Sequence, residues 1–193
     1  MVLLLPIAFI PLLGYAIAAT RAANLNPALG PPPWTATLRL LLDGFWTTLV
    51  LLVLTAPFAL ALNPLAGAID GVHLWHVSDR GLSQVYAHVV AGFSLALPWG
   101  LLLLLLMPHA TLRFAASGHP RDLFNFPAAF RGVRADFPTW NVAAAAMVTG
   151  WIIGVACAGL LCVGLLPGIF YAILVSAHAS AALDAPGEGP SAR

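Results

Sequence analysis

The stretch Thr139–Leu183 constrains the fold most, because its roughly 45 residues include no Asp, Glu, Lys or Arg. A single helix of that length, rising about 1.5 Å per residue, would be about 67 Å long. The hydrocarbon core of a bilayer is only about 30 Å thick. The stretch therefore predicts two membrane spans, at residues 139–160 and 164–183, with a turn within Gly159–Gly168.

The rest of the chain is similarly apolar. Of its 193 residues, 61% are hydrophobic and 8% are charged, whereas a soluble domain has about 25% charged residues. This composition predicts that lipid surrounds much of the chain. Three more apolar stretches, residues 2–19, 38–62 and 83–107, are long enough to cross a bilayer. We therefore expect an all-α, polytopic transmembrane helical bundle of about five spans, forming one domain at residues 1–183 with a disordered tail at residues 184–193.

Polar residues give two further expectations for the second span. Arg39 and Asp43 lie one helical turn apart at its start and are expected to pair. Asn63-Pro64 is a turn signal and is expected to open the loop that follows the span.

The segment Pro108–Pro138 is a polar interruption that predicts a short amphipathic interfacial helix between spans three and four. Its apolar residues recur at intervals of three and four: Leu123, Phe126, Phe130 and Val133. Asn125 or Asp122 is expected to cap this helix. Its basic and aromatic residues are expected to lie at the membrane surface: Arg113, Arg121, Phe126, Phe130, Arg131 and Arg134. The arginines would contact anionic headgroups, and docking of a cytoplasmic partner on this helix is the alternative.

The arginines also predict the orientation in the membrane. With five spans, seven of the eight fall on one side: Arg21, Arg39, Arg113, Arg121, Arg131, Arg134 and Arg193. Basic residues stay cytoplasmic, so we expect a prokaryotic inner-membrane protein with its N-terminus outside and its C-terminus cytoplasmic. Pro6 and Pro11 interrupt the first span, and a re-entrant hairpin there would change the side of the N-terminus only. The net charge of +1 gives no field that would attract nucleic acid.

Small residues along the fourth span predict close helix packing. Ala146, Gly150, Gly154 and Ala158 stand four residues apart, and such a ridge allows another helix to approach closely in lipid. The partner helix belongs either to this chain or to another subunit, so other integral membrane subunits are expected partners besides lipid.

Histidines are the weak candidates for metal or cofactor binding. His73 and His76 lie near Asp70 and Asp79, but their spacing matches no strong metal motif, so a polar outer loop is the simpler interpretation. His178, with His109 and His88, would be the ligands if the protein bound haem or chlorophyll. One hydrogen bond at the inner interface is the simpler role for His178, and we predict no cofactor.

Catalysis and ion-coupled transport are not predicted. The sequence contains no arrangement of paired carboxylates, no Gly-rich phosphate loop and no Ser/His/Asp set that would indicate an enzyme. No charged residue falls in the middle of a predicted span, where transporters carry such groups.

Four short motifs carry a family resemblance. They are Pro11-Leu12-Leu13-Gly14-Tyr15 with Arg21; Pro33-Trp34 with Asp43-Gly44; Phe114-Ala115-Ala116-Ser117-Gly118 with Phe124-Asn125-Phe126; and Gly159-Leu160-Leu161-Cys162-Val163-Gly164 with Tyr171 and Ala177-His178. In this order the chain resembles an uncharacterised prokaryotic integral membrane family labelled domain of unknown function 4013. The resemblance implies several membrane helices and brings no activity, cofactor or catalytic residue.

Together these features favour a non-catalytic integral membrane protein that serves as a scaffold or accessory subunit of a larger complex, with a respiratory or photosynthetic assembly as one option. A small transporter or lipid-handling protein is one alternative, and a haem- or chlorophyll-binding membrane protein is the other.

Overall fold

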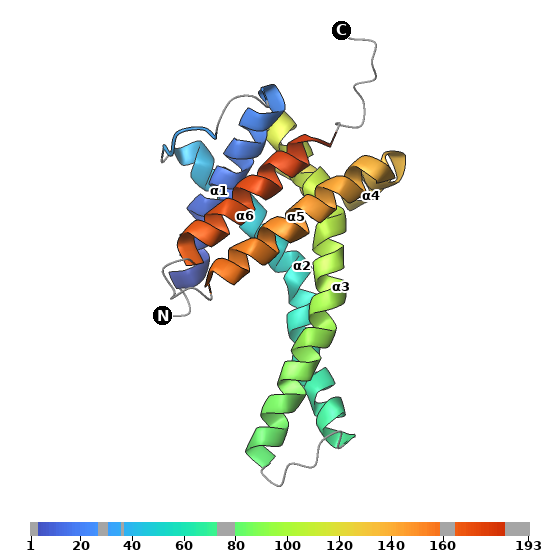
Figure 1. Cartoon of the computed structure of the whole chain (residues 1–193). Helices are drawn as coiled ribbons and strands as arrows, with labels where there is room; N and C mark the ends of the chain where they lie inside the picture. Colours follow the sequence, from blue (N-terminus) through green and yellow to red (C-terminus); the bar gives the residue numbers. More distant parts are fainter. Residues whose placement is uncertain (1–3, 27–30, 36, 73–79, 159–164, 184–193) are drawn as a thin grey trace. The chain divides into compact units, whose positions relative to one another are not determined.

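The computed structural model describes residues 4–26, 31–35, 37–72, 80–158 and 165–183, and within these ranges it is helical without any strand. The helices are α1 (Leu4–Leu25), α2 (Leu38–Gly71), α3 (Arg80–Ser117), the 3-10 helix η1 (Pro120–Asp122), α4 (Phe126–Ala135), α5 (Phe137–Ala158) and α6 (Leu165–Ala181) (Figure 1). The all-α fold class is therefore confirmed. Of the turn predicted within Gly159–Gly168, residues 159–164 lie outside the described residues and the rest belongs to α6; the tail at residues 184–193 is also outside the described residues.

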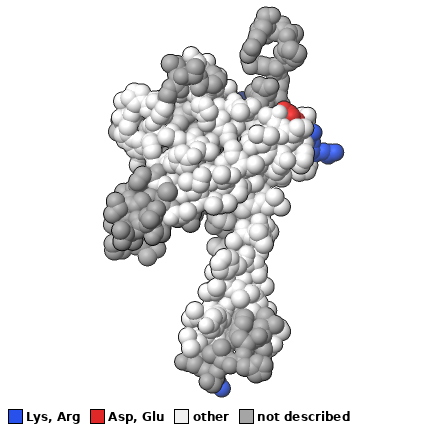
Figure 2. Space-filling view, in the orientation of Figure 1, with Lys and Arg blue, Asp and Glu red and all other residues white. Residues whose placement is uncertain are grey.

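Two of these helices, α2 and α3, are long and apolar enough to cross a membrane. They contain 34 and 38 residues, which at about 1.5 Å per residue gives lengths of about 51 and 57 Å. Helices also occupy most of the predicted spans at residues 2–19, 139–160 and 164–183. Few charged side chains are visible on the face of the molecule shown in Figure 2.

The turn expected at Asn63-Pro64 is wrong, because α2 continues through Pro57 and Pro64 to Gly71. A proline removes one hydrogen bond from a helix, and the other backbone bonds on both sides of it can still form. The packing of Leu65 and Ile69 against neighbouring alanines holds this last part of α2 in place.

By its contacts the chain divides into two compact units, which we describe separately. The hairpin unit is Leu51–Leu104, and the junction unit is Met1–Val50 together with Leu105–Arg193.

The hairpin unit pairs the second part of α2 with the first part of α3 in antiparallel orientation. Near the end of α2, the Ser83 hydroxyl donates to the Asp70 carboxylate. Further along, Ala66 is buried with Ala87 and Ala91. At the other end, Trp99 Nε1 donates to Thr55 Oγ1 at 3.2 Å. Alanines at the contact let the helices approach closely, which leaves the large apolar side chains on the outside: Leu52, Val53, Leu60, Leu82, Val85, Val89, Phe93, Leu97 and Leu101.

In the junction unit, α6 packs against both α1 and α5 (Figure 1). Tyr15, Leu40 and Ala177 form a buried cluster that joins α1, α2 and α6. Trp34 stacks on the Tyr15 ring at 4.7 Å, and the Tyr15 hydroxyl donates to the Pro32 carbonyl at 2.8 Å. The proline-rich segment before α2 is therefore fastened to α1.

Candidate functional site

The closest approach between α1 and α2 is a crossing at two glycines. A Cβ atom placed on Gly14 would lie 1.9 Å from the Leu40 carbonyl oxygen, and one placed on Gly44 would lie 1.9 Å from the Ile10 carbonyl oxygen. Both obstacles are backbone atoms, which cannot rotate away. The two helices can therefore cross at this distance only because neither position carries a side chain.

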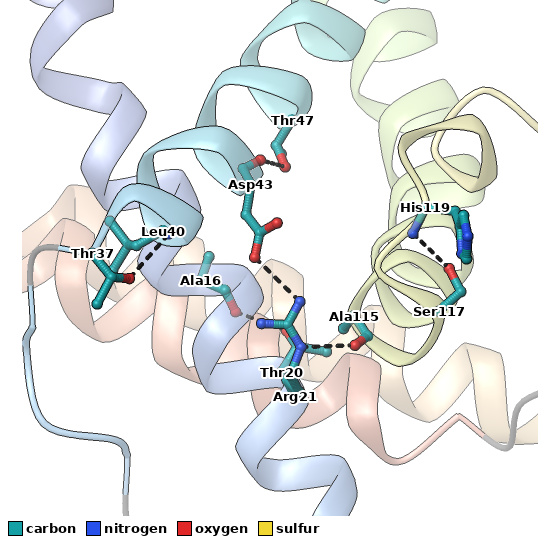
Figure 3. A network of polar contacts seen from close by, with 10 residues as sticks. All are labelled: Ala16, Thr20, Arg21, Thr37, Leu40, Asp43, Thr47, Ala115, Ser117 and His119. Atoms are coloured by element: carbon teal, nitrogen blue, oxygen red, sulfur yellow. Dashed lines mark hydrogen bonds and ion pairs between the residues drawn. The ribbon is translucent and has the colours of Figure 1, made fainter.

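One polar network lies beside this crossing, and it joins α1, α2 and α3 (Figure 3). The Nη2 atom of Arg21 is 3.2 Å from Oδ2 of Asp43, and its Nε donates to the Ala115 carbonyl oxygen at 2.9 Å. The two side chains are 23% and 10% exposed. An arginine shielded to this degree is stabilised by bonds to a charged partner and a carbonyl at once.

The threonines around this network bond within their own helices. Thr20 Oγ1 donates to the Ala16 carbonyl at 2.9 Å, and Thr47 Oγ1 donates to the Asp43 carbonyl at 2.8 Å. Thr37 Oγ1 accepts from the Leu40 backbone N–H at 3.2 Å, which is the bond of a helix N-cap. The buried hydroxyls of Thr20 and Thr47 are thus satisfied without using the charged pair.

A tight turn follows α3 on the same side of the junction unit. Gly118 has φ of +70°, the left-handed conformation that ends many helices, and its N–H donates to the Phe114 carbonyl at 2.8 Å. The Ser117 hydroxyl donates to the Asp122 carboxylate and accepts from the His119 N–H. Arg39 Nη2 would be 3.7 Å from a Cβ at Gly118, so the exposed Arg39 side chain points toward this turn.

The expected Arg39–Asp43 ion pair is therefore wrong, because the structure pairs Asp43 with Arg21. Arg21 lies beyond the predicted span at residues 2–19, but α1 continues to Leu25 and carries it on a helix. The sequence spacing could have indicated this contact, because Gly14 and Arg21 are seven residues apart, two turns along one face of α1. The face that crosses α2 therefore also carries the arginine.

These contacts coincide with the sequence motifs. The model of the family described as Protein of unknown function (DUF4013) matches residues 1–167. The chain belongs to this family. Three of the motifs on which the resemblance rests contribute the junction residues of this DUF4013 chain: Gly14 with Arg21, Asp43-Gly44, and Ala115 with Gly118. No curated protein and no solved structure matches the chain.

The predicted helix-packing ridge of the DUF4013 chain lies only partly at a helix contact. A Cβ on Gly154 would lie 2.6 Å from the Gly168 carbonyl oxygen, and one on Gly150 would lie 2.9 Å from Cγ1 of Val175, so both glycines pack on α6 of the same chain. Ala146 is exposed instead, and Met147 is buried. Steps of four residues drift by about 40° around a helix, so the contact follows mixed steps of three and four. The side chain of Ala158 lies outside the described residues.

The candidate histidines occupy three different settings. His88 is exposed in the hairpin unit, with Nδ1 at 2.8 Å from the Gln84 carbonyl of its own helix. His178 is exposed on α6. His109 is only 3% exposed, and its Nδ1 has no hydrogen-bond partner among the described protein atoms. His73 and His76 lie outside the described residues, and the described part of the chain brings no three metal-binding side chains together.

The His109 ring packs directly against α4. A Cβ on Gly132 would lie 2.4 Å from Cδ2 and 2.8 Å from Nε2 of His109. The backbone of α4 therefore occupies the space on the Nε2 side of the ring, which leaves no room there for a haem iron.

The residues predicted at the membrane surface fall at the end of α3 and on α4. Arg121, Phe130, Arg131 and Arg134 are exposed, and Arg113 and Phe126 are partly buried.

The predicted amphipathic helix is present at residues 126–135. Asn125 is its N-cap, as expected, and accepts from the Ala128 N–H at 3.3 Å. The expected apolar stripe is only partly buried, because Phe130 is 45% exposed while Ala128, Ala129 and Gly132 are buried.

Asp136 links the end of α4 to the start of α5. Its Oδ1 accepts from the Thr139 backbone N–H at 3.2 Å, and the hydrogen bonds from Thr139 lower the pKa of this carboxyl below its usual value of 3.8.

A carboxyl whose pKa is lowered by folding stabilises the folded state at a pH above the unfolded pKa, and this stability is lost as the pH falls through the folded pKa. We expect Asp136→Asn to lower the thermal midpoint at pH 7, and the difference from wild type to shrink as the pH falls below the usual carboxyl pKa of 3.8. A difference that persists unchanged at low pH would contradict the role of the charged cap.

Proposed function

We propose that this protein is a non-catalytic integral membrane protein that acts as a scaffold or accessory subunit of a larger membrane complex. The proposed membrane location rests on the outward-facing apolar surface of α2 and α3. Of the most apolar 18-residue stretch in each helix, 17% is buried in α2 and 11% in α3. A core helix of a soluble protein buries most of such a stretch, whereas lipid stabilises apolar side chains that face outward.

The bundle proposed here has about five spans, with α1, α5 and α6 also in the membrane and α4 at its inner surface. The bias of seven arginines against one supports a cytoplasmic C-terminus in a prokaryotic inner membrane. The protein should then resist extraction by alkaline carbonate, and a C-terminal reporter should be active only in the cytoplasm. Extraction by carbonate would refute the membrane location, and a reporter active outside would refute the orientation.

The scaffold role is supported by the polar groups of the junction, which form their hydrogen bonds with other groups of the protein. Arg21 and Asp43 bond to each other and to a backbone carbonyl, and the buried threonines bond within their helices. Such a closed network stabilises a helix crossing and does not present a group to a substrate. The exposed apolar faces of the hairpin unit offer contact area for other membrane helices.

Two alternatives remain as proposals with their own tests. A transporter or lipid-handling role would require ions or lipids to move across liposomes that contain the purified chain. A haem or chlorophyll role would give a coloured protein; of its candidate ligands, His88 and His178 are exposed, and α4 packs against the Nε2 side of the His109 ring.

Co-purification tests the accessory role. The tagged full-length chain is solubilised in a mild detergent, and we expect a fixed set of integral membrane proteins to remain with it in constant ratio. An unrelated tagged membrane protein purified in parallel is the control. A monomer that carries only lipid and detergent would contradict the accessory role while leaving the membrane location intact.

A further inference from the structure

We propose that the exposed face of α4 binds the headgroups of anionic phospholipids. This α4 face consists of the exposed Phe130, Arg131 and Arg134 with the partly buried Phe126 at its edge, and the inference rests on the membrane location proposed above. It adds a preference for lipid charge, which membrane insertion alone does not require.

The opposite side of α4 is fixed to the protein by small residues. Ala128, Ala129, Gly132 and Val133 are buried, and Gly132 lies directly against the His109 ring of α3. A side chain at position 132 would collide with the His109 ring, so this side of α4 is the one that packs on the protein. The remaining arc of the helix must then face outward.

That outward arc combines aromatic and basic side chains. At about 100° per residue, Phe126 and Arg134 lie about 40° to either side of Phe130, and Arg131 lies about 100° from it. Phe130 is 45% exposed, and both arginines are exposed. No acidic residue occurs within α4.

Both ends of α4 are held without any ligand. The Asn125 side chain accepts from the Ala128 N–H at the start, and the Asp136 N–H donates to the Gly132 carbonyl at 3.2 Å at the end. The α4 face is therefore preformed, and binding a headgroup there does not require folding of the helix.

The positive charge and the apolar surface of the α4 face together indicate which ligand it binds. Within the described ranges, no carboxylate forms an ion pair with Arg131 or Arg134, and the nearby Asp136 carboxylate accepts from Thr139. Figure 2 shows basic atoms projecting at the edge where Figure 1 places α4, with a smaller acidic area beside them. A phosphate group pairs with the arginines, and the acyl boundary covers Phe130. An anionic phospholipid supplies both, whereas a free phosphate would leave the aromatic surface in water.

Lipid titration into the full-length protein tests the proposal. The protein in a neutral detergent is titrated with phosphatidylglycerol or phosphatidylcholine, and bound lipid is counted by native mass spectrometry. We expect tighter binding of phosphatidylglycerol, and a loss of about fivefold per arginine, or about 25-fold in Arg131→Gln/Arg134→Gln. The preference should also weaken as salt is added.

Three matched controls make the result specific. Arg80→Gln removes an arginine from the hairpin unit and should leave the affinity unchanged, and Arg131→Lys/Arg134→Lys should keep most of it. Circular dichroism should show the same helix content in every variant. Equal binding of both lipids by wild type, or an unchanged preference in the glutamine variant, would overturn the proposal, and the second result would place the lipid site elsewhere on the protein. Carbonate extraction, measured separately, reports on the membrane location itself.

Discussion

Gly14→Ala is expected to destabilise the folded chain by about 3 kcal/mol or more, the upper range for an overpacked contact. The added methyl group would lie 1.9 Å from the Leu40 carbonyl oxygen, so α1 and α2 must move apart. That movement also lengthens the distance between Arg21 and Asp43, which belong to the same two helices. The measurement is the thermal midpoint of the purified protein in detergent, followed by circular dichroism.

Gly44→Ala should have an effect of similar size, because it blocks the same crossing from the other helix. The double variant should cost clearly less than the sum of the two, since helices that have already separated accommodate the second methyl group. Gly67→Ala is the matched control in α2: no atom lies within 4 Å of the added Cβ, and alanine favours a helix. A loss at Gly67 as large as that at Gly14 would show that the crossing is not the cause.

The sequence predicts this fold well where a single helix decides the outcome. The apolar stretches and the amphipathic pattern after Asp122 indicate helices, and Asn125 caps α4 as expected. The helix ends are less predictable. Asn63-Pro64 is a turn signal, but α2 continues through it to Gly71, where Leu65 and Ile69 pack against the buried alanine cluster.

The junction could not be predicted in the same way, because it depends on contacts between helices. Spacing along α2 favours a pair between Arg39 and Asp43, but position 39 is exposed at the start of the helix. Asp43 is turned toward α1, where the glycine crossing brings Arg21 within 3.2 Å. Similarly, a ridge of residues spaced by four includes Ala146, whereas Met147 is the buried residue and Ala146 is exposed. Only knowledge of which helices touch selects between these faces.

The Arg21–Asp43 pair gives the second large effect. Asp43→Leu should destabilise the chain by about 3 kcal/mol, because Arg21 keeps its charge in a largely buried position without a counter-charge. Arg21→Met should cost a similar amount, since it leaves the Asp43 carboxylate buried and also removes the bond to the Ala115 carbonyl. The thermal midpoint and the denaturant midpoint both measure these losses.

The double variant separates a charged pair from two independent contacts. Arg21→Met/Asp43→Leu leaves no unpaired charge, so it should be more stable than either single variant, although the Ala115 carbonyl then lacks its donor. Arg39→Met is the matched control, because it removes an arginine one turn from Asp43 that is exposed, and it should cost about 0.5 kcal/mol or less. If Arg39→Met proved as costly as Arg21→Met, Asp43 would pair along its own helix, and the junction of α1, α2 and α3 would have to be held by the glycine crossing alone.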